Sequence, residues 1–146
     1  MRKRFTLIIV AALAMLCLAF AACFTEAELP AIEGGWGYDP ETGEYFSGEV
    51  SGRAAGFGGP NAVGVTIYLV DGFIITVDLD LARETSTWAN RVREILPGII
   101  TRTNSFNFTD GIVTGPTAPI TVRGVREAGR AALLDIPHVY EDDLDF

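Results

Sequence analysis

Residues 63–81, VGVTIYLVDGFIITVDLDL, decide the fold of this chain. Apolar residues alternate with small or polar ones on both sides of Asp71-Gly72. A period of two is typical of a strand that buries one face, and Asp-Gly favours a two-residue turn between antiparallel strands. The stretch therefore predicts a β-hairpin whose apolar face must be covered by other elements.

One strand before the hairpin and one helix after it are predicted next. Residues 45–55 alternate weakly and predict the strand. The helix is indicated by an apolar repeat at helical spacing: Trp88, Val92, Ile95 and Leu96. One of residues 85–87 is expected to cap the helix, and Pro97-Gly98 is expected to end it.

A second helix is predicted over residues 118–134, after an irregular strand. One stripe of this helix allows close approach to the sheet: Thr121, Gly124, Val125, Ala128 and Ala132. Arg123, Arg126 and Arg130 share the opposite face, which is expected to be solvated. The fold class that follows is α+β, a small antiparallel sheet packed against two helices.

The N-terminal residues have the pattern of an export signal. Arg2, Lys3 and Arg4 precede an uncharged, mostly apolar run to Ala22. Phe20-Ala-Ala-Cys23 resembles a bacterial lipobox, so Cys23 is the expected lipidation site, with ordinary cleavage or an uncleaved anchor as the alternatives. We expect an extracytoplasmic lipoprotein, in the periplasm or at the cell surface, held to the membrane by its lipid or N-terminal anchor.

The rest of the chain is divided by composition. Residues 1–22 are the signal or anchor, and 23–43, rich in Glu, Gly and Pro, are expected to be a flexible tether. The domain is expected at 44–135, followed by an acidic tail at 136–146. Trp36 and Tyr38, inside the tether, are expected to pack on the domain.

Charge and composition exclude several classes of function. The net charge is −8, and it becomes −11 without residues 1–22, which hold three of the eleven basic residues and none of the nineteen acidic ones. So acidic a chain is not expected to bind nucleic acid. The chain has one cysteine outside the signal and one histidine in all. We therefore expect no disulfide, no thiolate catalyst and no metal cluster built on these residues.

The start of the second helix is the candidate site. Thr117 is placed to cap it, and Pro119 suits its first turn. The same residues have a functional reading, because unpaired N–H groups and the dipole at a helix start attract phosphate. The alternative is that Thr117 and its neighbouring prolines only mark the start of an ordinary helix.

Several stretches, in this order, resemble the FMN-binding domain family: residues 44–48, Gly56-Phe-Gly-Gly-Pro60, 65–67, 71–74, Glu84-Thr85 and Thr114-Gly-Pro-Thr117. This family includes exported flavin-carrying lipoproteins and flavin-bearing subunits of ion-pumping redox complexes. The resemblance implies that Thr117 is esterified to the FMN phosphate by a flavin transferase. It also implies cofactor-binding roles for Thr114, Gly115, Asp110, Glu84 and Thr85.

Two departures from the family pattern keep an alternative open. Pro116 stands where the family has Ala, and Asp110 lies one residue too far upstream. The resemblance implies an extracytoplasmic FMN-binding electron carrier, rather than a stand-alone enzyme, that exchanges electrons with a membrane redox complex. The alternative is a flavin-free lipoprotein of the same fold that acts as a binding or structural module.

Overall fold

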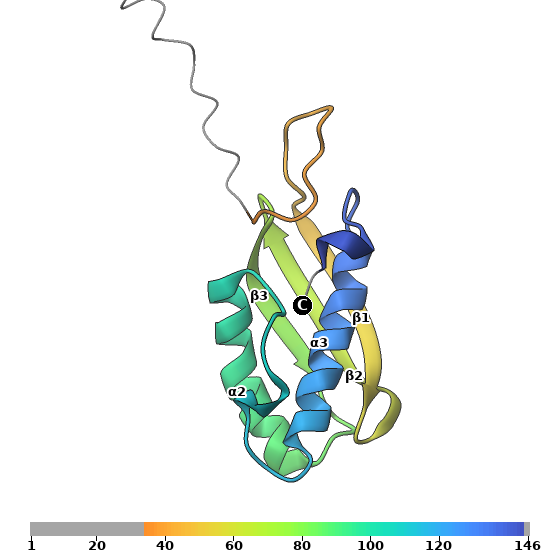
Figure 1. Cartoon of the computed structure of the whole chain (residues 1–146), viewed down its shortest axis with the longest axis vertical. Helices are drawn as coiled ribbons and strands as arrows, with labels where there is room; N and C mark the ends of the chain where they lie inside the picture. Colours follow the sequence, from red (N-terminus) through yellow and green to blue (C-terminus); the bar gives the residue numbers. More distant parts are fainter. Residues whose placement is uncertain (1–33, 145–146) are drawn as a thin grey trace, which may run out of the picture. The chain divides into compact units, whose positions relative to one another are not determined.

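The computed structural model describes residues 34–144, which form an α+β domain (Figure 1). The elements are β1 (Gly48–Gly56), β2 (Gly59–Val70), β3 (Phe73–Asp80), α2 (Ser86–Thr103), η1 (Asp110–Ile112), α3 (Ala118–Leu134) and η2 (Glu141–Asp143). The predicted fold class is confirmed. The signal, Cys23 and most of the expected tether lie outside the described residues. Within residues 34–144, no helix is both long and apolar enough to span a membrane.

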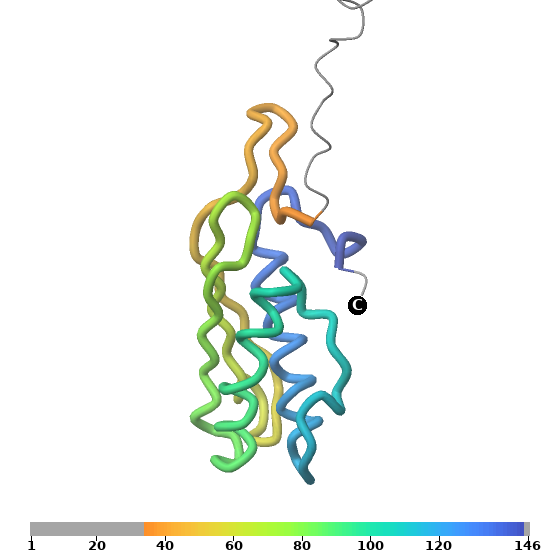
Figure 2. Tube along the Cα trace, turned by 90° about the vertical axis from the view of Figure 1, so that its left-hand side faces the viewer, coloured from red at the N-terminus to blue at the C-terminus, as the bar shows by residue number. Residues whose placement is uncertain are grey.

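The sheet is antiparallel, in the order β1-β2-β3. Its register aligns Val50 with Ile67 and Ile67 with Val77, so these side chains share one face. All three are buried, and both helices lie on that face (Figures 1 and 2). The hairpin expected from the Asp71-Gly72 signal is therefore present, and its apolar face forms the core.

The two helices run in the same direction, and both begin at the end of the domain that holds the β1–β2 turn (Figure 1). All five residues of the predicted small-residue stripe of α3 are buried. A Cβ at Gly124 would lie 2.7 Å from the carbonyl oxygen of Ala55, so α3 approaches β1 more closely than a side chain allows. The predicted role of the stripe is confirmed.

The prediction that Pro97-Gly98 ends the first helix is wrong. Helix α2 continues through Pro97 to Thr103. Its buried face explains this, because Val92, Leu96 and Ile100 lie one turn apart and all are fully buried. Burial of Ile100 favours another turn of helix, which offsets the hydrogen bond lost at proline.

The segment between the helices is not a strand, contrary to the prediction. Residues 104–117 form a connection that contains η1 and runs along the outer side of the helix layer (Figure 2). Phe106 is fully buried, and its ring lies where a side chain at position 129 would stand, so Gly129 makes room for it. Side-chain burial, rather than strand pairing, fixes this connection.

The domain is longer at both ends than its predicted range of 44–135. Trp36 Nε1 donates to Asn104 O at 2.9 Å, and Trp36 N donates to Gly72 O at 2.9 Å. The predicted packing of Trp36 is confirmed, and residues 34–43 belong to the domain rather than to a tether. In the expected acidic tail, Ile136, Val139 and Leu144 are buried.

Candidate functional site

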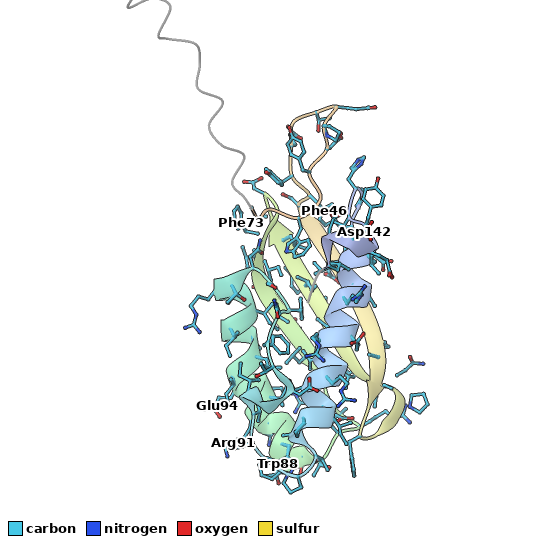
Figure 3. The ribbon with its side chains drawn as sticks, viewed as in Figure 1. Phe46, Phe73, Trp88, Arg91, Glu94 and Asp142 are labelled. Atoms are coloured by element: carbon cyan, nitrogen blue, oxygen red, sulfur yellow. The ribbon has the colours of Figure 1, made fainter. Side chains whose placement is uncertain are left out.

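Residues 44–48 and 71–74 of the family resemblance lie at one end of the domain (Figure 1). The residues with an expected cofactor-binding role lie toward the other end. Both helices begin there, and the β1–β2 turn and the segment between β3 and α2 lie beside them (Figure 1). Trp88, in the first turn of α2, marks this end in Figure 3. The structure thus brings the β1–β2 turn, Glu84-Thr85 and Thr114–Thr117 to the same region.

Glu84 is buried, and its carboxylate is held by three donors. Phe57 N donates to Oε2 at 3.2 Å, Gly58 N donates to Oε1 at 2.9 Å, and the Thr121 hydroxyl donates to Oε2. A Cβ at Gly56 would meet Oε1 at 2.4 Å, so only glycine leaves room for this carboxylate. Glu84 therefore joins the β1–β2 turn to the first turn of α3, and its acceptor sites face protein donors.

Thr85 and Thr114 are both exposed. Thr85 is the N-cap of α2, as expected for one of residues 85–87, and its carbonyl accepts from Trp88 N and Ala89 N. Its side chain makes no capping hydrogen bond. The hydroxyl of Thr85 and that of Thr114 therefore remain open to solvent.

Gly115 packs against the indole ring of Trp88. Its φ is +152°, and a Cβ at this position would lie 2.5 Å from the ring. Trp88 is partly buried and packs against the hydrophobic core, which confirms the predicted core position. Glycine is thus favoured at position 115 for two reasons: the positive φ disfavours other residues, and the indole ring of Trp88 leaves no room for a Cβ.

Thr117 is the N-cap of the 17-residue helix α3. Its carbonyl accepts from Ile120 N at 3.2 Å and from Thr121 N at 3.3 Å, but its side chain makes no capping bond. The hydroxyl oxygen is inaccessible to solvent and has no hydrogen-bond partner within residues 34–144. Buried polar atoms are nearly always paired, so this unpaired hydroxyl needs an explanation.

Asp110 pairs with arginines rather than lying open for a ligand. Its Oδ2 lies 3.2 Å from Arg123 Nε, and its Oδ1 lies 2.9 Å from Arg126 Nη1. The second contact lacks hydrogen-bond geometry, so we regard it as a charge contact. Arg126 also donates to Phe108 O at 3.0 Å and is partly buried. The expectation that the arginine face of α3 is solvated is therefore wrong for Arg126.

The sequence did not indicate the partners of Glu84. Thr121 was expected only as a small residue in a packing stripe, and the amides of Phe57 and Gly58 carry no side-chain signal. The glycines around Phe57 were the available hint, because they permit a turn that points successive N–H groups toward one acceptor.

Comparisons with known proteins found no matching family, no matching curated protein and no matching solved structure. The resemblance to the FMN-binding domain family is neither supported nor refuted by them. Among the described residues, no group of three or more His, Cys, Asp or Glu side chains is arranged to hold a metal ion.

Proposed function

We propose that this protein is an extracytoplasmic, membrane-anchored electron carrier that binds FMN at the N-terminus of α3. The unpaired hydroxyl of Thr117 carries the proposal. The family resemblance selects this residue as the phosphate acceptor. It is also the hydroxyl at the helix start for which the described residues supply no hydrogen-bond partner.

The hydroxyl oxygen of Thr117 is inaccessible to solvent, so a phosphate reaches it only when the turn before α3 opens. Pro119 has no N–H, and the amides of Ile120 and Thr121 donate to Thr117 O. The amide of Ala118, a fully buried residue, is thus the first-turn N–H that has no acceptor within residues 34–144 and is available to an anion. Gly115, with a φ of +152°, adds no side chain of its own to the turn before Thr117, and the indole ring of Trp88 packs against it.

When bound, FMN supplies one- or two-electron transfer, and the protein supplies position and electrostatics. In this proposal Thr117 holds the phosphate, through an ester or a hydrogen bond, and the N-terminus of α3 stabilises its charge. Glu84 positions the first turn of α3 through Thr121 and does not contact the phosphate.

The test is attachment of flavin in cells. The chain is co-expressed with a flavin transferase, denatured, and examined for flavin fluorescence and intact mass. We expect a mass gain of one FMN less one water, as an ester requires, in the wild-type chain and in Thr114→Ala, which removes a neighbouring exposed hydroxyl. Thr117→Ala is expected to lose it.

Noncovalent binding is tested on chain purified under native conditions. A yellow chromophore that dissociates on denaturation would retain the carrier function without the ester. An unmodified mass together with a colourless native protein would refute both forms of the proposal.

The flavin-free module is the second candidate, and Glu84 is the observation that favours it. A carboxylate already lies at the first turn of α3, bonded to Thr121, so the anion preference of this helix end is partly met by the chain itself. Asp110 is likewise paired with Arg123 and Arg126. A colourless native protein with an unmodified mass would support this candidate.

A further inference from the structure

A small hollow lies at the opposite end of the domain from Thr117. It has a volume of about 260 Å³ and is lined from two parts of the chain: Gly37, Asp39, Thr42, Glu44, Tyr45, Phe46, Pro137 and His138. Pockets for drug-sized molecules measure roughly 300–1,000 Å³. The hollow lies just below this range, and it has room for one long side chain.

Two carboxylates face the same side of this hollow. Asp39 and Glu44 are partners in an antiparallel β-bridge, so their side chains project in the same direction. The amide of Glu41 donates to Asp39 Oδ1 at 2.8 Å, and this hydrogen bond holds the pKa of Asp39 below its ordinary value. His138 Nε2 lies 4.0 Å from Asp39 Oδ1, and Glu44 makes no side-chain hydrogen bond within the described residues.

Aromatic rings and further acids surround the hollow. The rings of Tyr38 and Tyr45 are 5.1 Å apart between centroids, and Tyr38 and Tyr140 are among the exposed large side chains. Asp71 lines an adjoining hollow together with Glu44 and Tyr45, and Asp142 lies at the same end of the domain (Figure 3). Glu141 is paired with Arg130 at 3.4 Å. Carboxylates beside aromatic faces are the surroundings that a guanidinium or ammonium group prefers.

We propose that this end binds a basic segment of a partner protein and that one arginine or lysine side chain enters the hollow between Asp39, Glu44 and Tyr45. Complementary charge favours this partner, because the acidic end attracts a basic segment and repels an acidic one. The exposed tyrosines supply apolar contact at the rim, where tyrosine is a frequent contributor to binding energy.

The test measures the affinity of the full chain, in non-ionic detergent, for a blocked hexa-arginine peptide. The double variant Asp39→Asn/Glu44→Gln removes two charges from the hollow. The control Glu41→Gln/Asp142→Asn removes two charges from the same end outside it. We expect the first pair to weaken binding by about tenfold or more and the control by less than about threefold.

His138 provides a local signal, because it is the single histidine of the chain and lines the hollow. Its ring-proton resonances are expected to shift on addition of hexa-arginine and to stay unchanged with hexa-glutamate. If the double variant unfolds, Glu44→Gln alone, at an exposed site, replaces it, with an expected loss of about threefold.

Equal weakening by the two charge-matched pairs, no shift at His138, or no saturable binding would overturn the proposal. The measurement uses chain made without a flavin transferase, so it does not depend on FMN. A failure here leaves the function proposed for Thr117 intact, and the reverse also holds.

Discussion

At the residue scale, Glu84 links three parts of the chain that are far apart in sequence. Its carboxylate accepts from Phe57 N and Gly58 N in the β1–β2 turn and from Thr121 in α3. The family motif drew attention to Glu84, but its partners could not be predicted, because they are brought together only by the packing of α3 on the sheet. The unpaired hydroxyl of Thr117 likewise became visible only in the folded chain.

Glu84→Gln is expected to destabilise the domain. The amide group of glutamine turns a donor toward groups that themselves donate, which leaves at least one buried polar group unpaired. The expected loss is about 1–3 kcal/mol of unfolding free energy, measured by urea titration. Glu127→Gln, on the exposed side of α3, is the control and should change little; equal midpoints for the two variants would contradict this role of Glu84.

Gly115→Ala tests the contact between the site loop and Trp88. A methyl group would lie 2.5 Å from the indole ring, at a φ of +152° that disfavours alanine. We expect a loss of about 1–3 kcal/mol and a change in tryptophan fluorescence. Gly111→Ala, where a Cβ has open space, is the matched comparison, and a similarly mild effect at Gly115 would show that the loop is not fixed by Trp88.

At the scale of elements, regular spacing of apolar or small residues predicted the strands and helices better than single helix-stop signals did. The alternation around Asp71-Gly72 predicted β2 and β3, and the spacing of small residues predicted α3 from Ala118 to Leu134. Pro97-Gly98 was misleading, because the burial of Ile100 stabilises a further turn of helix beyond this pair. The strand expected between the helices failed because its apolar residues pack individually into the core.

Gly98→Ala tests whether α2 continues past Pro97. Gly98 lies inside the helix, and a Cβ there meets nothing within 4 Å. Alanine should therefore stabilise the domain by about 0.5–1 kcal/mol, measured by thermal or urea unfolding. Gly43→Ala, at a φ of +74°, is expected to destabilise it. No gain at Gly98 would indicate that the helix ends earlier.

At the scale of the whole molecule, Asn104 connects segments that composition placed in separate regions. It is the C-cap of α2, at a φ of 52°. Its side chain accepts from Ile74 N at 2.8 Å and donates to Gly34 O and Gly72 O. Glycine-rich composition suggested a tether up to residue 43, but it carries no information about such distant partners. The domain boundary was therefore the least predictable part of the fold.

Asn104→Ala is expected to loosen residues 34–46 and to cost about 1–3 kcal/mol, because three hydrogen bonds, two of them partly buried, are lost together. Amide hydrogen exchange should become faster at Ile74, Trp36 and Phe46. Asn107→Ala, at an exposed position of the connection after α2, is the control. Unchanged exchange at these amides would show that the segment is held by apolar packing alone.

The domain formed by residues 34–144 has one end that holds Thr117 and an opposite, acidic end that holds the hollow. The function proposed for the first end is tested most directly by mass spectrometry of the tryptic peptide 103–123, after co-expression with a flavin transferase that labels a known substrate. We expect this peptide to carry one FMN, with fragment ions that place it on Thr117. An unmodified peptide from a colourless native protein, beside a fully labelled control substrate, would contradict the account.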